Sequence, residues 1–397
     1  MIDIPNNHGS PSLPDHILQR ISAFQQRMNE WGGKHILHGC SAGTTSIRLF
    51  SNDYLSLRSE AKLKKQFLGS VQNFDNESVM SAVFLHGDNP TSLLEAELAN
   101  WLAAPATIIC QSGWTANVGL IQTIANPTTP VYVDALAHMS LRRGVHAAGA
   151  HPIIFSHNQA QHAFRQISKH GPGIIVVDAV YSTNGSLCPL EEFVELAEAT
   201  KCVIVVDESH ALGTHGPEGS GLARQYGLES RIHFRTASLA KAFAGRAGLI
   251  ACPANFKTYF GMESLPAIFS SRVLDHEIAW LAHALTFIAH ANDRRTRLKA
   301  ITRKLRADLM DIGFNIMTGT EQIIALETGS EHNTMATRDL LEANEILGSI
   351  FCWPATPRNR ALVRLSLHAG LTDDDVCRIA IGCRETMAKL DGKIRIR

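Results

Sequence analysis

Short apolar runs alternate with amphipathic helical patterns along most of this 397-residue chain. The runs are rich in β-branched residues and end at Asp, Ser or Gly, as is typical of strands buried on both faces. Such alternation predicts an α/β fold with a doubly wound, mostly parallel sheet. The predicted strands are 47–50, 106–110, 131–133, 153–155, 174–177 and 203–206, and the predicted helices include 13–30, 93–102 and the segment after Gly113.

The last quarter of the chain has a different pattern. A long helical region at 276–310 is interrupted at Asn292-Asp293-Arg294-Arg295, and beyond it lie a strand pattern at 323–327, a helical pattern at 336–346 and a strand pattern at 363–367. We therefore expect a smaller α+β domain after the large one. The predicted division is an N-terminal helix and arm (1–55, with Ile17, Ile21 and Phe24 on one side of the helix), a large domain (56–290) and a small C-terminal domain (291–397).

Composition excludes several classes of function. Lys plus Arg and Asp plus Glu are balanced at 37 each, so no bulk positive charge attracts nucleic acid. No apolar stretch approaches the roughly 20 residues that span a bilayer, and the first residues do not resemble a secretory signal. The eight cysteines include no CxxC pair, which argues against a structural zinc site or a disulfide framework. We expect a cytoplasmic enzyme without a metal.

The strongest chemical signal follows the apolar run 203–206. Asp207 and His210 come directly after it, and Lys241 follows Ser238 in the segment Ser238-Leu239-Ala240-Lys241. Ligands of open α/β sheets bind where strands end. A carboxylate suits a pyridinium nitrogen and a lysine suits a Schiff base, the pair that pyridoxal phosphate (PLP) requires. The alternative is an Asp that caps the next helix and an unrelated surface lysine.

Other strand ends carry polar residues too. Ser112-Gly113-Trp114 opens a helix, so its free N–H groups suit a phosphate, although an ordinary Ser N-cap has the same pattern. His138, after the strand 131–133, either lies on an aromatic cofactor or is a hydrogen-bonded core histidine. Ser182 precedes Asn184-Gly185, which is also a simple turn sequence.

Arg364 stands inside the apolar C-terminal strand pattern. A half-buried guanidinium requires an anionic partner, and its planar fork suits a carboxylate. Either a substrate carboxylate or a structural Asp or Glu fulfils that need.

These motifs in their order resemble the α-oxoamine synthase family. The resemblance extends from about residue 12 to about residue 385, and it implies PLP fold type I, the aspartate aminotransferase-like fold. Among family members the wording of the motifs is most similar to synthases of α-hydroxyketone quorum-sensing autoinducers. The motifs are Asn52-Asp53-Tyr54-Leu55, Ser112-Gly113-x-x-Ala116-Asn117, Asp134…His138, Asp207…His210, Ser238-x-x-Lys241 and Arg364.

The resemblance implies a role for each matching residue. Lys241 would carry the cofactor and act as acid and base, Asp207 would pair with the ring nitrogen, His210 would bond the phenolic oxygen and His138 would stack on the ring. The remaining cofactor residues would be Ser112, Gly113, Trp114, Ser182 and Ser238, with Ser270 or Ser271 reaching the phosphate of a neighbouring subunit in a homodimer with shared active sites. Asn52 and Arg364 would hold the carboxylate of the amino acid.

Two segments depart from the biosynthetic members of the family. Ser78–His86 replaces a glycine-rich stretch that contains an arginine, and Arg272-Val273-Leu274-Asp275 replaces a proline-containing segment. Both changes argue against the substrates of the biotin and heme pathways. The apolar side chains of the first segment either line a channel for an acyl tail or pack in the core; they are Val79, Met80, Val83, Phe84 and Leu85.

The resemblance implies an acyltransferase that condenses a small α-amino acid, 2-aminobutyrate or S-adenosylmethionine, with a medium- or long-chain acyl-CoA. Decarboxylation would give an α-aminoketone, the precursor of an α-hydroxyketone autoinducer. The alternative is a standard α-oxoamine synthase, such as 8-amino-7-oxononanoate synthase or 2-amino-3-ketobutyrate CoA ligase, using alanine, glycine or serine. A non-catalytic PLP-fold sensor is disfavoured because Asp207 and Lys241 are both present. A nicotinamide dehydrogenase is disfavoured because no G-x-G-x-x-G follows a predicted strand.

Overall fold

The computed structural model describes residues 12–70, 79–316 and 318–390. Three parts of the predicted segments lie outside these ranges: Ser78, residues 1–11 of the N-terminal arm and residues 391–397 of the C-terminal domain. Its helices are α1 (Asp15–Glu30), η1 (Leu57–Ser59), α2 (Ala61–Ser70), η3 (Ala82–Phe84), α3 (Pro90–Leu102), α4 (Gly113–Ile124), α5 (Met139–Ala147), α6 (Ala160–His170), α7 (Leu190–Thr200), η4 (Pro217–Gly219), α8 (Leu222–Gln225), α9 (Ala254–Glu263), α10 (Leu265–Ile268), α11 (Asp275–Ala289), α12 (Asn292–Ile312), α13 (Glu331–Ala343) and α14 (Asp373–Leu390). Its strands are β1 (Ile47–Arg48), β2 (Ala106–Cys110), β3 (Val131–Asp134), β4 (Pro152–Phe155), β5 (Ile174–Asp178), β6 (Val203–Asp207), β7 (Phe234–Ser238), β8 (Gly248–Cys252), β9 (Ile323–Gly329), β10 (Ile346–Leu347), β11 (Ser349–Phe351) and β12 (Ala361–Ser366).

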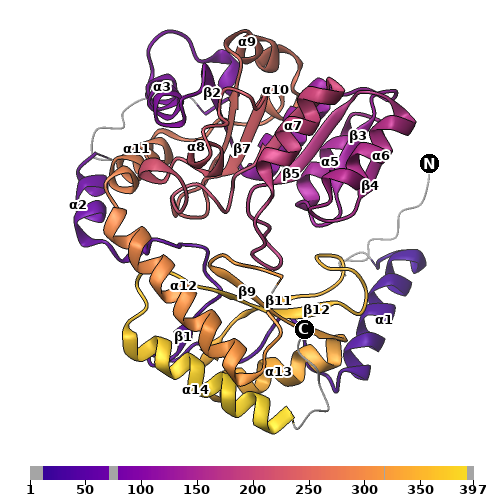
Figure 1. Ribbon diagram of the computed structural model, residues 1–397, viewed down its shortest axis with the longest axis vertical. Coiled ribbons are helices and arrows are strands. Elements are labelled where there is room, and N and C mark those ends of the chain that lie inside the picture. Colours follow the sequence, from indigo (N-terminus) through magenta and orange to yellow (C-terminus); the bar gives the residue numbers. More distant parts are fainter. Residues whose placement is uncertain (1–11, 71–78, 317, 391–397) are drawn as a thin grey trace, which may run out of the picture.

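The large part of the molecule is built on one sheet, which Figure 1 shows in the upper half of the view. Among the described residues it has seven strands in the order β2-β8-β7-β6-β5-β3-β4. Strands β4, β3, β5, β6 and β7 are parallel, while β8 runs antiparallel to both β7 and β2. The predicted PLP-type α/β fold, with a mostly parallel sheet, is confirmed.

Both faces of this sheet are covered, which explains why its strands are almost wholly apolar. Ile174 and Val176 of β5 belong to a core with α4 and α5, whereas Ile175 and Val177 belong to a core with α6 and α7. Alternate side chains of a strand point to opposite faces, so a strand buried on both faces needs consecutive apolar residues. The sheet therefore positions the polar residues that follow its strands with little freedom.

A second, smaller sheet lies below the first in Figure 1, flanked by α12, α13 and α14. Its order is β11-β12-β9, and both pairs are antiparallel. The N-terminal segment joins this part: β1 pairs in parallel with β10, and the Ser366 N–H donates to the Leu49 carbonyl (2.8 Å). Residues just after position 48 are thereby held beside the end of β12.

The predicted strands of the large sheet are confirmed to within a residue or two, whereas β7 and β8 were missed. Strand β8 is an apolar, fully buried run after Gly248, and the prediction overlooked it. Strand β7 contains Arg235, Thr236 and Ser238, so it does not read as an apolar run. Tertiary contacts supply the missing stability, because buried Arg235 pairs with buried Glu208 (3.6 Å). The helix predicted at 336–346 is shifted: α13 begins after Ser330, whose side chain accepts from the Asn333 N–H, and β10 follows it.

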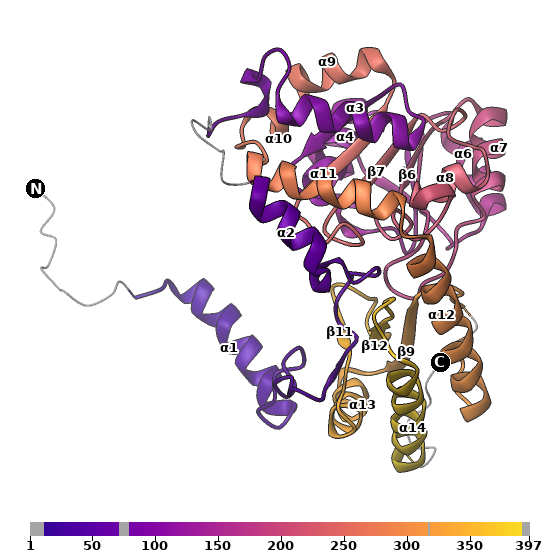
Figure 2. The same ribbon diagram turned by 90° about the vertical axis from the view of Figure 1, so that its left-hand side faces the viewer.

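Helix α1 extends away from both sheets (Figure 2), and none of its residues is buried. Of the expected apolar side, Ile21 and Phe24 are exposed and Ile17 is half-buried, and Leu18 is a further exposed hydrophobic residue of this helix. No helix in the described ranges is both long enough and apolar enough to cross a membrane.

Candidate active site

The ends of three adjacent parallel strands bring the strongest candidates together. Asp178 at the end of β5 is in register with Asp207 at the end of β6, and Asp207 is in register with Thr236 of β7. The Ser238 N–H donates to Oγ of Ser209 at 2.7 Å, which ties the segment after β6 to the end of β7. Residues that are 29 positions apart in sequence therefore meet at one edge.

The beginning of α4 forms an anion cradle against this edge. Ser112 caps the helix in a reciprocal capping box with Thr115 and also accepts from the Ala116 N–H, leaving the N–H groups of Gly113 and Trp114 for a ligand. A Cβ on Gly113 would lie 2.6 Å from Cβ of Ser238. Glycine is thus required for Ser112, Gly113 and Ser238 to lie side by side at the positive end of the helix.

Asp207 is a buried carboxylate held by uncharged donors. Asn117 Nδ2 donates to its Oδ2 (2.7 Å) and the Ser209 N–H to its Oδ1 (2.8 Å), and in the described part of the chain no ion pair reaches it. Asn117 Nδ2 also donates to Oγ of Ser140 (2.9 Å), which in turn lies 2.7 Å from Nδ1 of His138. A protonated ring nitrogen would supply the cation that this carboxylate lacks.

Lys241 lies after β7 in a half-buried setting that disfavours its charged form. Burial lowers its pKa, the nearby Arg364 lowers it further, and Asp207 acts in the opposite direction. The pKa of His138 is likewise lowered, chiefly by burial and then by Lys241, against the effect of Asp207. A less basic lysine has a larger neutral fraction, as a nucleophile or general base needs.

His210 is connected to the predicted carboxylate-binding residues through Tyr54. The Tyr54 hydroxyl lies 2.6 Å from Nδ1 of His210 and 3.3 Å from Oδ1 of Asn52. That Oδ1 also accepts from Nη2 of Arg364 at 2.7 Å. Burial lowers the pKa of His210 well below its ordinary value, and Lys241 and Arg364 lower it further, so the imidazole is neutral.

Arg364 is buried, and no carboxylate pairs with it among the described residues. Its Nη1 donates to the main-chain carbonyl of Ser182 (2.8 Å), and its guanidinium lies over the ring of Phe351 (4.5 Å to the centroid). The structural Asp or Glu partner that the sequence left open is therefore absent from this part of the chain. The contact of Ser182 with this group uses its carbonyl rather than its hydroxyl.

Ser270 and Ser271 lie elsewhere, on the connection between α10 and α11. Ser270 Oγ donates to the Pro266 carbonyl. The same connection is joined to the segment 79–85: Ser81 Oγ donates to the Ala267 carbonyl (2.7 Å) and the Arg272 N–H to the Met80 carbonyl (2.8 Å). Their predicted role, contact with a neighbouring subunit's phosphate, stays a prediction.

The apolar side chains of segment 79–85 are not core residues in this chain. Val79 is 70% exposed, Met80 41% and Phe84 57%. Nearby Phe269 is 80% exposed. Exposed large apolar side chains that lie close together are typical of a binding surface, so we expect a ligand or a partner to bury these residues.

Sequence reasoning did not assign roles to several residues that hold the site together. Tyr54, Asn117 and Ser140 each hydrogen-bond a predicted catalytic side chain. Tyr54 and Asn117 stand inside the quoted motifs, so their presence there was a usable signal. Nothing in the sequence around Phe351 indicates its contact with Arg364.

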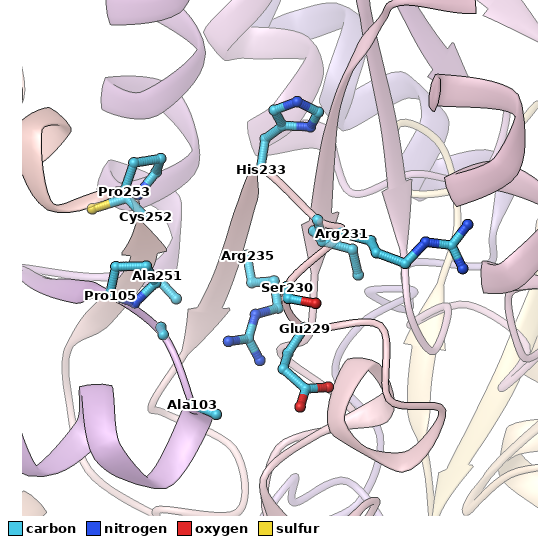
Figure 3. A pocket seen from close by; sticks show the side chains of 12 residues that line it. Ala103, Pro105, Glu229, Ser230, Arg231, His233, Arg235, Ala251, Cys252 and Pro253 are labelled. Atoms are coloured by element: carbon cyan, nitrogen blue, oxygen red, sulfur yellow. The ribbon is translucent and has the colours of Figure 1, made fainter. Parts of the chain in front are cut away.

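A separate pocket of about 430 Å³ lies at the opposite ends of the strands, beside the beginning of β7 and the end of β8 (Figure 3). Its lining includes His233, Arg235 and Cys252 but none of the predicted site residues. The buried charge of Arg235 is already balanced by Glu208, so this pocket offers no uncompensated cation.

Comparison with known proteins agrees with this geometry. The family profile of class I and II aminotransferases matches residues 44–381. CAI-1 autoinducer synthase of Vibrio campbellii is 42% identical over 375 residues, 94% of this chain and 95% of that protein. The chain therefore belongs to the class I and II aminotransferase family, in its acyl-transferring α-oxoamine synthase branch, whose members depend on PLP.

More distant relatives agree with this assignment. An 8-amino-7-oxononanoate synthase of Lysinibacillus sphaericus is 28% identical over 331 residues, 82% of this chain and 85% of that protein. A serine palmitoyltransferase structure from S. paucimobilis superposes with a TM-score of 0.86 at 20% identity, over 95% of this chain and 98% of that one, and therefore shows a common fold. The predicted family and enzyme class are confirmed.

The residues present fit PLP. Asp207 is a buried carboxylate without a cation, the start of α4 has free N–H groups, and Lys241 has a lowered pKa. These three features match the ring nitrogen, the phosphate and the aldehyde of the cofactor, respectively.

We expect Gly113→Ala to weaken PLP binding by at least about tenfold, because the new Cβ displaces either the start of α4 or Ser238. Gly261→Ala is the matched control, since a Cβ there meets nothing within 4 Å. The measurement is PLP affinity by absorbance titration of the two apoproteins. Equal affinities would show that the close approach of Gly113 to Ser238 does not matter for the phosphate.

Proposed function

We propose that this protein is a PLP-dependent acyltransferase that condenses a small α-amino acid with a medium- or long-chain acyl-CoA. The amino acid is 2-aminobutyrate or S-adenosylmethionine, and decarboxylation gives an α-aminoketone, the precursor of an α-hydroxyketone autoinducer. The similarity to CAI-1 autoinducer synthase supports this choice over the standard α-oxoamine synthases, which are less similar.

The observation that carries the proposal is the position of Arg364. It is a buried guanidinium without a carboxylate partner in the described chain, and its charge acts on Lys241. A substrate carboxylate bound to Arg364 and Asn52 would bring the α-carbon of an amino acid close to the lysine. Bidentate carboxylate binding by arginine is strong and orienting.

Each side chain then has a defined task. PLP, when bound, supplies the carbonyl that condenses with the amino group and the ring that accepts electrons from the α-carbon. Lys241 removes the α-proton, Asp207 holds a proton at the ring nitrogen, and His138 covers the ring face. The α-carbon attacks the thioester carbonyl, and CoA leaves as the thiol after taking up a proton. The carboxylate leaves as carbon dioxide, and Lys241 returns a proton to the α-carbon.

The acyl tail is assigned to the segment 79–85. Val79, Met80 and Phe84 are exposed, and Val83 and Leu85 are half-buried. This exposure supports a channel lining over core packing within one chain. Each methylene buried there contributes about 0.8 kcal/mol. A site of this kind selects for chain length.

A homodimer with shared active sites completes the proposal. Phe269, Val79 and the apolar side of α1 are uncovered in the single chain. A second copy placed over these surfaces would bury them and bring Ser270 and Ser271 to the phosphate of the other subunit. All eight cysteines are free thiols, which agrees with a cytoplasmic location.

Lys241→Ala is expected to abolish aminoketone formation and to remove the visible absorbance that borohydride reduces. Mass spectrometry after incubation with mixed acyl-CoAs and 2-aminobutyrate, S-adenosylmethionine, alanine, glycine and serine identifies the products. Lys304→Ala, an exposed lysine of α12, is the control and should behave as the parent. Products from alanine, glycine or serine alone would favour the standard α-oxoamine synthase.

Chain length should affect kcat/KM steeply. Four additional carbons are expected to raise it by up to about a hundredfold or more, and Phe84→Ala should shift the preferred length. Because Phe84 is exposed in the single chain, we expect its replacement to leave thermal stability nearly unchanged. Phe164→Ala, at an exposed phenylalanine of α6, serves as the control. A flat profile, or a preference for two to four carbons, contradicts the long-chain assignment.

Shared sites predict complementation between defective subunits. A variant with Ser270→Asp and Ser271→Asp should lose phosphate affinity by charge repulsion, and Lys241→Ala is inactive. In a re-equilibrated equal mixture of the two, about a quarter of the sites combine an intact Lys241 with intact serines from the partner. Activity should therefore rise above that of either parent. If both defects acted within one subunit, mixing would restore nothing.

A further inference from the structure

Tyr54 is a fully buried tyrosine between the two halves of the site. It lies in the segment that follows β1, and its hydroxyl lies between His210, from the large sheet, and Asn52. Burial raises its pKa above the ordinary value, with Arg364 acting in the opposite direction, so the hydroxyl keeps its proton. The hydroxyl can therefore donate one hydrogen bond, and the acceptor that it chooses determines which ring nitrogen of His210 carries the proton.

The two acceptors are not equivalent. Oδ1 of Asn52 is 3.3 Å away and already accepts from Arg364 at 2.7 Å, whereas Nδ1 of His210 is 2.6 Å away. The shorter contact is in the range of a strong O–H bond. The distances favour Nδ1 as the acceptor for the Tyr54 proton, and a neutral imidazole that accepts at Nδ1 has its own proton on Nε2.

We propose that Tyr54 is a positioning residue: it fixes the tautomer of His210 so that Nε2–H donates to the phenolic oxygen of PLP. The inference rests on the proposed placement of PLP and deepens it, since that oxygen is anionic when the cofactor is attached to Lys241 and needs a donor. The main-chain carbonyl of His210 is anchored separately by Gln322 Nε2 (2.9 Å), so Tyr54 controls the ring rather than the backbone.

Tyr54→Phe removes the donor and keeps the shape. A donor to the phenolic oxygen withdraws negative charge from beside the bond between the cofactor and Lys241. Without it, the proton of that bond is held more tightly, and the pH midpoint of the visible absorbance change should rise by roughly 0.5 to 1 pH unit. The other charged or titratable groups that act on His210 are Lys241, Arg364 and His138, which stay in place.

Tyr132→Phe is the matched control. Tyr132 is also fully buried, and its hydroxyl donates to the Gly171 carbonyl at 2.5 Å, at the other end of the large sheet. It should lose comparable thermal stability without a change of midpoint. In a His210→Asn background, Tyr54→Phe should have no further effect on the midpoint.

If Tyr54→Phe does not fold, Asn52→Ala tests in its place which acceptor the Tyr54 hydroxyl uses. It removes the second acceptor and leaves the bond from Tyr54 to His210, so the midpoint should stay unchanged while KM for the amino acid rises severalfold. A downward shift would mean that the hydroxyl donates to Asn52 in the parent, which overturns the inference. An unchanged midpoint in Tyr54→Phe that still binds PLP overturns it as well. A parent protein that binds no PLP at all contradicts the proposed function itself.

Discussion

A buried positive charge without an anion of its own determines the character of the site. Arg364 is held by the Ser182 carbonyl and Asn52 Oδ1, which are neutral acceptors, and its face lies on Phe351. Neutral acceptors satisfy the N–H groups of a guanidinium but do not compensate its charge, so the free energy of burying it is recovered fully only when a carboxylate binds. The same charge lowers the pKa of both Lys241 and His210. In the proposed function, substrate binding and the protonation states of Lys241 and His210 are therefore coupled through Arg364.

Asp207, at the end of β6 in the large sheet, has the opposite charge to Arg364 of β12 in the small sheet. It is a buried carboxylate surrounded by uncharged donors, Asn117 and the Ser209 N–H. In the described ranges, the large sheet thus contributes a buried carboxylate without a cation, and the small sheet contributes a buried guanidinium without an anion. A molecule with a cationic ring nitrogen on one side and a carboxylate on the other satisfies both, as PLP carrying an amino acid does. The electrostatics select the cofactor and the substrate class together.

Two hydrogen-bond networks restrict the side chains of the site. One network connects Asp207, Asn117, Ser140 and His138, and the other connects His210, Tyr54, Asn52 and Arg364. Side chains in such networks have few alternative rotamers, which keeps reactive groups within the small tolerances that catalysis needs. Apolar segment 79–85 and α1 are different, because their uncovered side chains are complementary to something outside this chain.

The sequence alone predicted a mostly parallel large sheet, five of its seven described strands and the residues at their ends. Buried parallel strands must be continuously apolar, so their ends at Asp134, Asp178 and Asp207 were visible as abrupt changes in polarity. Lys241 and Arg364 were identifiable because a charged residue inside or just after a strand is rarely buried unless it has a partner or a function. Strand β7 was not visible, since it contains Arg235, whose buried charge is balanced by Glu208 from the segment after β6. The apolar pattern of β8 was present in the sequence and was overlooked. Only the tertiary structure decided that Tyr54 meets His210, 156 residues away, and that Arg364 has no carboxylate partner in the described chain. Those contacts depend on how two sheets and the N-terminal segment pack, and local patterns of polarity contain no information about distances between separate elements.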